Sequence, residues 1–452
     1  MRWPVNYSLV LIAALLYLNP HPVHAESLPQ AVEHMIRTNP EVQTMIYGRL
    51  ARDEEVKQSR AQYFPKVDLQ GGVGVEDYTK PNDKSLDPQE VVLSLRQNVF
   101  AGFQSVNEVD RQKARIRSAA YRLRATTENT ALEAAKVYLE VLKNQELVEL
   151  AKENELLHER IADQVSLRSE SGVSRKVDFD QVDGRLALAK SNTVITKINL
   201  IDSQTNYQAV VGHMPENLTI PEAVDSCIPE SLDVAKKYAL ENHPTLLSAN
   251  TDLTARKMQR KVSSAPFWPT LDLEVDKYWG KDVDGTEGDT EYLAGWVRLR
   301  YNLFSGWSDK ARKNETVYLE DEAREIRNNA ARQVIESIQL SWMANQAVTD
   351  RIAYLEKRVT AASSTAEAYS KQFNIGQRTL LDVLDTSAEL IDAKKDLSTA
   401  KYDRLRAQFR ILNGMGNITR SLGLAWPDEA MVNDDEQEYP EEETSGKSND
   451  NG

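Results

Sequence analysis

The chain has 452 residues, a net charge of −14 at pH 7, 41% hydrophobic residues and 27% charged residues. This balance excludes a chain that is disordered throughout, and after residue 25 no apolar run is long enough to span a bilayer as a helix. Residues 428–452 hold ten Asp or Glu and one Lys and so carry −9 of the charge, which leaves −5 on the rest and no basic footprint for nucleic acid.

The N-terminus has the three parts of a secretory signal peptide. Arg2 supplies the positive charge, residues 9–18 (LVLIAALLYL) form the apolar core, and Val23 and Ala25 are small residues placed for cleavage. We therefore expect a signal peptide at 1–25 that is removed after Ala25. No cysteine lies near that site, which argues against a bacterial lipoprotein anchor.

The remaining chain carries a duplication at a constant offset of 204 residues. Residues 63–69 (YFPKVDL) correspond to 267–273 (FWPTLDL), and residues 98–103 (NVFAGF) correspond to 302–307 (NLFSGW). An offset that never slips predicts two copies of one supersecondary unit. The expected organisation is a first structural repeat at 26–212, a linker at 213–230, a second structural repeat at 231–416 and an acidic, disordered tail at 417–452.

Each repeat is predicted to begin with a helix and continue into a β-hairpin. Ser27 and Ser231 are good N-caps for the opening helices. Apolar and polar residues then alternate with the period of a strand. The predicted strands lie at 67–76 and 91–98, joined by a polar loop at 77–88, and at 271–276 and 293–303.

After each hairpin comes a long run without Gly or Pro, between Gly102 and Gly172 and again between Gly306 and Gly376. At a rise of 1.5 Å per residue each run forms a helix of about 100 Å. Apolar residues recur at steps of three and four, which is typical of coiled-coil packing. A shorter helix is predicted to return after each run, at 177–211 and at 380–412.

The turn of the second hairpin, 373–385 (FNIGQRTLLDVLD), carries the most distinctive charge pattern. Thr379 is placed to cap the returning helix, and Asp382 and Asp385 follow at an i, i+3 spacing on one face. The first repeat has Asp178 where Asp382 stands and Gln181 where Asp385 stands. Aspartate early in a helix is also favourable through the helix dipole alone, which is the alternative explanation of the pair.

Four strand segments with one apolar and one charged face cannot close a barrel alone, since single-chain outer-membrane barrels begin at about eight strands. Lipid does not tolerate an open sheet edge. The strands therefore lie in a soluble sheet or in a transmembrane β-barrel shared between protomers. The second option predicts a mixed α and β fold with four strands per chain, a long coiled-coil-like helical part, and a polar inner face that includes Arg96, Asp272, Glu274, Arg298 and Arg300.

This layout resembles the TolC family of outer-membrane export channels over residues 27–424. The resemblance rests on the duplication, the aromatic pair and proline before a strand, the 302–307 motif, and above all residues 376–385 (GQRTLLDVLD). It implies a homotrimer in the bacterial outer membrane, with a twelve-stranded barrel and a periplasmic tunnel of twelve helices. The implied partners are a periplasmic adaptor (membrane fusion protein) and an inner-membrane ABC or proton-driven transporter.

The resemblance also implies roles for residues at the hairpin turns. Asp382 and Asp385 match the paired aspartates that ring the periplasmic constriction. Arg378 matches the arginine that ties the closed tip together, and Asp178 is its expected acidic partner.

Three further positions follow from the same match. Gly172 and Gly376 match the tip turns on which the adaptor docks. Phe373 departs from the family pattern, because it stands where members can carry a tyrosine, and a latch through that hydroxyl is absent here.

An enzyme and a soluble periplasmic adaptor are the two alternatives from other classes of function. The six histidines show no metal-ligand spacing, and no nucleophile elbow or phosphate loop is present, so the sequence predicts no enzyme, cofactor or metal site. A soluble periplasmic coiled-coil adaptor is the alternative of another class, although one hairpin would be expected there instead of two. For the exported substrate, the missing lipoprotein signal favours type I protein secretion over multidrug or small-molecule efflux.

Overall fold

The computed structural model describes residues 25–80, 83–170, 176–221 and 224–432, which fall into two compact units. The helical unit takes residues up to 45, 125–247 and 325–425, and the sheet unit takes 46–124, 248–324 and the residues from 426 onward. Residues 1–24 of the signal peptide predicted at 1–25, and the turn glycine Gly172, lie outside the described residues. None of the described helices has both the length and the apolar character needed to cross a membrane.

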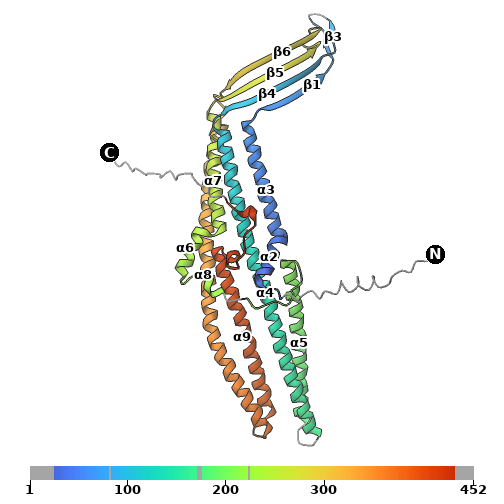
Figure 1. The fold of residues 1–452 in the computed structure, drawn as a ribbon, viewed down its shortest axis with the longest axis vertical. Coiled ribbons are helices and arrows are strands. Elements are labelled where there is room, and N and C mark those ends of the chain that lie inside the picture. The colour runs from blue at the N-terminus through green and yellow to red at the C-terminus, as the bar shows by residue number, and fades with distance from the viewer. Residues whose placement is uncertain (1–24, 81–82, 171–175, 222–223, 433–452) are drawn as a thin grey trace, which may run out of the picture. The chain divides into compact units, whose positions relative to one another are not determined.

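The predicted duplication and mixed α and β fold are confirmed, because the helices of the second repeat begin 204 residues after those of the first (Figure 1). The opening helices are α2 (Leu28–Thr38) and α3 (Pro40–Arg60), matched by α6 (Leu232–Asn242) and α7 (Pro244–Val262). The long helices α4 (Gln104–Glu170) and α8 (Ser308–Asn374) both have 67 residues, and the returning helices α5 (Lys176–Val211) and α9 (Leu380–Met415) both have 36.

The strands of both repeats join in one antiparallel sheet in the order β1-β4-β5-β6 (Figure 1). Their bounds are β1 Lys66–Val73, β4 Gln89–Ala101, β5 Thr270–Lys281 and β6 Asp289–Arg300. The pairing of β4 with β5 connects the first repeat to the second. Among the described residues, β1 and β6 each pair along one edge only.

A short hairpin, β2 (Glu76–Tyr78) with β3 (Lys84–Leu86), stands where the sequence predicted only a polar loop. The sequence did not predict this hairpin because its residues are mostly polar and show no alternation of apolar residues. Local hydrogen bonds contribute to its stability. The Tyr78 hydroxyl donates to Glu76 Oε2 at 2.8 Å, and the Gly74 amide donates to the Pro88 carbonyl at 2.9 Å.

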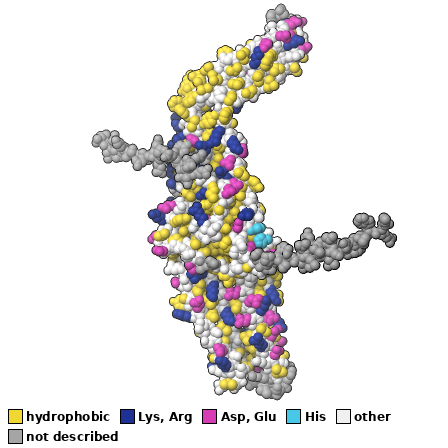
Figure 2. All heavy atoms as spheres, in the orientation of Figure 1, with side chains coloured by type: hydrophobic (Ala, Val, Ile, Leu, Met, Phe, Trp, Pro, Cys, Tyr) yellow, Lys and Arg dark blue, Asp and Glu magenta, His cyan; other side chains and the backbone are white. Residues whose placement is uncertain are grey.

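The sheet exposes an unusual amount of apolar surface, which Figure 2 shows as yellow side chains gathered over the strands. Leu69 and Val73 of β1 are 72% and 86% exposed, and Leu293 and Val297 of β6 are 70% and 69% exposed. Contiguous apolar surface of this kind marks a surface made for lipid or for another protein chain.

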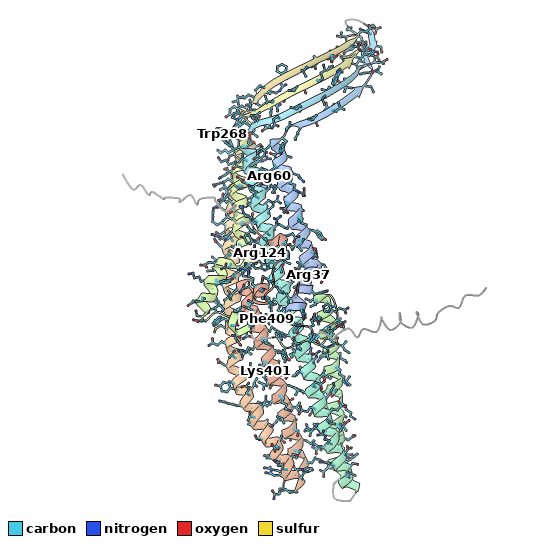
Figure 3. All side chains as sticks on the ribbon, in the orientation of Figure 1. Arg37, Arg60, Arg124, Trp268, Lys401 and Phe409 are labelled. Carbon is cyan, nitrogen blue, oxygen red and sulfur yellow. The ribbon has the colours of Figure 1, made fainter. Side chains whose placement is uncertain are left out.

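A tight left-handed turn joins each hairpin to its long helix. Gly102 and Phe103 have φ of 61° and 64°, and Gly306 and Trp307 repeat these angles at 63° and 67°. A Cβ on Gly102 would lie 2.5 Å from the Ala265 carbonyl oxygen, so only glycine fits there. The left-handed φ at both Gly102 and Gly306 accounts for the glycine that the two copies share at this point. The Phe103 ring also packs edge-on against Trp268, which Figure 3 labels.

The helical unit buries its apolar residues in interfaces between helices. In the second repeat, Ala235 and Ala239 of α6 pack against Val334 and Ile338 of α8 and against α9. Small residues on α6 let the backbones approach closely. Phe409 of α9, labelled in Figure 3, is fully buried.

The prediction of a disordered tail from residue 417 is wrong for residues 417–432. In the helical unit, Ile418 and Thr419 are fully buried, and their amides donate to the buried carboxylate of Glu128. In the sheet unit, the Arg124 guanidinium lies 4.6 Å from the Trp426 ring centroid, and its Nε donates to the Ala430 carbonyl at 2.8 Å. The acidic composition of 428–452 concealed these anchors, and residues 433–452 lie outside the described part.

We predict that Gly416→Ala destabilises the protein more than Gly423→Ala does. Both glycines have left-handed φ, 69° and 72°, which costs alanine about 1 kcal/mol. A Cβ on Gly416 would also lie 2.3 Å from Pro244 Cδ, whereas a Cβ on Gly423 meets no atom within 4 Å among the described residues. The overlap adds about 1–3 kcal/mol.

Thermal denaturation of the two purified variants measures this difference, with Gly423→Ala as the matched control for backbone strain. Equal losses of stability would contradict the close packing of Gly416 against the start of α7.

Candidate functional site

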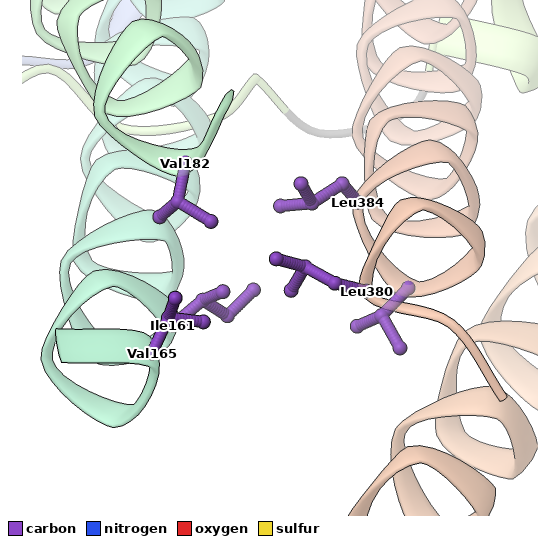
Figure 4. Close-up of a cluster of buried hydrophobic side chains, with 6 residues drawn as sticks. Ile161, Val165, Val182, Leu380 and Leu384 are labelled. Carbon is purple, nitrogen blue, oxygen red and sulfur yellow. The ribbon is translucent and has the colours of Figure 1, made fainter. Parts of the chain in front are cut away.

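The ends of the two helical hairpins meet in an apolar cluster (Figure 4). The figure shows side chains from α4 and α5 pointing toward side chains from α9. The buried members are Ile161, Val165, Val182, Leu380, Val383 and Leu384. Because both repeats contribute, the cluster gives the first turns of α9 a fixed position against the first hairpin.

Asp382 is held by the N-cap of α9. The Thr379 hydroxyl and amide donate to Asp382 Oδ2 at 2.8 and 3.1 Å, and the Asp382 amide donates back to the Thr379 hydroxyl at 3.3 Å. This is a capping box, as the sequence predicted for Thr379. Hydrogen bonds from the Thr379 side chain and then from its amide lower the pKa of Asp382 below its ordinary value, so this carboxylate keeps its charge near neutral pH.

Asp385 has a different partner. Arg185 of α5 donates to Asp385 Oδ1 at 3.0 Å, which joins the first hairpin to the second beside the apolar cluster. The two side chains are 36% and 54% exposed. Arg185 was not predicted from the sequence, although one signal was present. At the 204-residue offset Arg185 corresponds to Glu389, so the two copies carry opposite charges at this position.

Arg378 makes its contacts within its own hairpin. Its guanidinium lies 4.1 Å from the Tyr369 ring centroid, and its Nε donates to Gln372 Oε1 at 3.0 Å. Asp178 lies half-buried in the first turn of α5. The latch between Arg378 and Asp178 therefore stays a prediction.

The other two predicted tip residues have clear local roles. Phe373 packs against the apolar cluster, so in this chain the ring supports the core of the tip. Gly376 has φ of 77°, and its amide donates to the Phe373 carbonyl at 3.0 Å, which closes the turn after α8.

The five residues predicted for a polar inner face lie on one face of the sheet. Arg298 and Arg300 both donate to Glu274 at 2.7 Å, and Arg300 also pairs with Asp272 at 3.5 Å. Arg96 stands directly opposite Glu274 in the register of β4 with β5. Glu274 is only 6% exposed, because the two arginines cover it. A lumenal position for this network stays a prediction.

Two stretches of the chain, 31–213 and 237–417, match the family model described as outer membrane efflux protein. The chain belongs to the outer membrane efflux protein family. Both halves match, as the duplication requires, and the sequence-based resemblance to TolC is thereby confirmed. Membership assigns the protein to the bacterial outer membrane and to export.

Named relatives span nearly the whole chain. The outer membrane efflux protein BepC of Brucella suis biovar 1 is 23% identical over 424 residues and covers 92% of each chain. The outer membrane protein TolC of Vibrio cholerae is 22% identical over 395 residues, covering 85% of this chain and 90% of its own. Crystal structures of CusC, which concern transmembrane channel formation, share the fold with a TM-score of 0.76 at 13% identity, covering 86% of this chain and 92% of that one.

We predict that Thr379→Val raises the pKa of Asp382, while Thr379→Ser leaves it near the parent value. Valine keeps the shape but removes the hydroxyl that contributes most to the lowered pKa, and loss of an N-cap side chain costs about 1 kcal/mol. A carboxyl group whose pKa is lower in the folded protein than in the unfolded protein stabilises the fold at pH values above the unfolded pKa. This stabilisation is lost as the pH falls through the folded pKa. The stability gap between variant and parent is therefore present at pH 7 and narrows in acid.

Carboxyl carbon-13 titration of aspartate-labelled protein, with thermal denaturation at pH 7 and pH 3, measures both effects. An unchanged Asp382 titration in Thr379→Val would contradict the assigned cap.

Proposed function

We propose that the protein is a homotrimeric channel-tunnel that carries substrates from the periplasmic side to the exterior. The observation that carries this proposal is a sheet with an apolar face in a chain of the outer membrane efflux protein family, in which β1 and β6 each have one edge without a partner among the described residues. A sheet of this kind needs further strands at β1 and β6, and copies of the same chain supply them.

The strand pattern supports a shared barrel. Bilayer hydrocarbon leaves every edge amide without a partner, at a cost of several kcal/mol for each, so open edges are excluded there. With β1 of one protomer paired to β6 of the next, three chains would close twelve strands. The apolar side chains would then face lipid, and the network of Arg96, Asp272, Glu274, Arg298 and Arg300 would face the lumen.

The helices support packing between copies. On α5, Leu188, Ile195, Ile198 and Ile201 are exposed at steps of seven, three and three residues, and the exposed Val194 lies beside them. On α8, Ile326, Leu340 and Tyr354 recur every fourteen residues and are also exposed. Heptad seams of this type pack against other helices in coiled coils, and here they would build the wall of a periplasmic tunnel.

The tip then becomes the periplasmic entrance. Three copies of Asp382 and Asp385 would form an acidic constriction that attracts cations and repels anions. Arg378 and Asp178 would hold its closed state, and the turns at Gly172 and Gly376 would receive the periplasmic adaptor. An inner-membrane ABC or proton-driven transporter would supply the driving force, since the duct itself performs no chemistry.

For the exported substrate we favour type I protein secretion, because no cysteine lies near the expected cleavage site to mark a lipoprotein efflux component. Small-molecule efflux is the alternative, and the name of BepC supports it. Deletion of the gene should remove a secreted protein from the culture medium. Drug sensitivity with an unchanged set of secreted proteins would reverse this assignment.

Purified, detergent-extracted protein should insert into planar bilayers and give small, cation-selective conductance steps from a trimer that dissociates on heating. The narrow acidic entrance sets the conductance and the sign of the selectivity. A soluble monomer that never inserts would contradict the channel and favour the periplasmic adaptor.

Replacing both Asp382 and Asp385 with alanine should weaken the block of this conductance by multivalent cations. Removing carboxylates a few ångström from the ion raises the half-blocking concentration by about tenfold or more. Asp392→Ala is the matched control, because Asp392 is an exposed acid on the same helix that pairs with Lys395 one turn away. If the half-blocking cation concentration were the same in the parent, the double aspartate variant and Asp392→Ala, the constriction would lie elsewhere.

A further inference from the structure

Among the residues that the structure describes, three ion pairs join α9 to the first helical hairpin. They are Arg185 with Asp385 at 3.0 Å, Glu153 with Lys394 at 2.7 Å, and Glu140 with Arg406 at 2.7 Å. In the second and third pairs α9 supplies the base and α4 supplies the acid. Only at the tip is the polarity reversed, with the acid on α9 and the base on α5.

The two repeats differ at both positions of the reversed pair. At the 204-residue offset, Asp385 corresponds to Gln181, and Arg185 corresponds to Glu389. The second copy thus carries an acid where the first is neutral, and the first copy carries a base where the second is acidic. The two changes meet in space, because the hairpin ends pack against each other.

The apolar cluster fixes the geometry of this pair. Val182, one turn before Arg185, is 1% exposed, and Leu384, next to Asp385, is fully buried. Figure 4 shows these two side chains facing each other across the contact between α5 and α9. The buried neighbours therefore hold the backbones of Arg185 and Asp385 close together, so the ion pair forms with less loss of conformational entropy.

We propose that Arg185 is a specificity-determining residue, which compensates half of the carboxylate charge at the periplasmic constriction. This inference rests on the proposed function of Asp382 and Asp385. The two carboxylates have unequal partners. The Thr379 hydroxyl and amide hydrogen-bond to Asp382, on which the Arg378 charge acts more weakly, whereas the Arg185 guanidinium pairs directly with Asp385. Three copies would bring six carboxylates to the entrance, three of them paired directly with Arg185, which sets how tightly the entrance holds cations.

Single-channel recording of Arg185→Gln tests the proposal, with La³⁺ and Mg²⁺ as blocking ions and a KCl gradient for selectivity. Two unit charges 4 Å apart in water interact by about 1 kcal/mol, which is about a fivefold change in an equilibrium constant. The half-blocking La³⁺ concentration should therefore fall at least about fivefold, and the cation-to-anion permeability ratio should rise. Arg185→Lys keeps the charge and should restore the parent values.

Lys394→Gln is the matched control for a purely structural role. It breaks the next pair along the same seam, but Lys394 lies nine residues from Asp385, or about 14 Å along α9. That distance exceeds the screening length of about 10 Å at 0.1 M salt, so La³⁺ block should stay at the parent value.

A charge-compensated variant, Arg185→Gln with Asp385→Asn, keeps the net charge of the parent entrance and should return block to within about twofold. This double variant also tests the proposal if Arg185→Gln alone does not form trimers, because it leaves no unpaired carboxylate beside the cluster. Trimer dissociation on heating reports assembly for each variant.

The outcomes separate this inference from the one it rests on. If Asp382→Ala with Asp385→Ala changes block but Arg185→Gln does not, or if Lys394→Gln has the same effect as Arg185→Gln, the role of Arg185 is overturned alone. If the double aspartate variant leaves block unchanged, the acidic constriction fails and the role of Arg185 fails with it.

Discussion

The antiparallel pairing of β4 with β5 is the constraint on which the sheet depends. It sets Leu95 opposite Val275 on one face and Arg96 opposite Glu274 on the other. Because side chains alternate along a strand, a slip of one residue would move Arg96 to the face that carries Val275. The lipid-facing role proposed for the apolar face depends on this register, and the register of β5 with β6 places the arginines that cover Glu274.

At the hairpin tips, the two repeats carry different charges. The capped Asp382 and the ion-paired Asp385 both belong to the second repeat, and the first repeat supplies Arg185. A half-exposed pair of this kind contributes only about 0–1 kcal/mol to stability. Its larger effect is on the local field, which matters at a narrow opening where the same charges from several copies come close together.

Much of the architecture could be predicted from the sequence, because the signals are local and repeated. The absence of Gly and Pro over the long helices, the alternation in the strands and the offset of 204 residues each specify backbone structure directly. Thr379 was predicted as a cap because threonine follows the turn at Gly376, and the structure adds its reciprocal hydrogen bonds with Asp382. The β2–β3 hairpin escaped prediction because its hydrogen bonds do not follow a pattern of apolar residues.

The sequence by itself determined two copies of a helix, hairpin and helical return, the family, and the acidic pair at the second turn. Only the tertiary structure decided which residue faces each carboxylate, and that residues 417–432 are anchored on Glu128 and Arg124. The physical reason is distance along the chain. Arg185 and Asp385 lie 200 residues apart, and Glu128 and Ile418 lie 290 residues apart. The periodicity of a sequence cannot predict a contact that depends on how two hairpins pack.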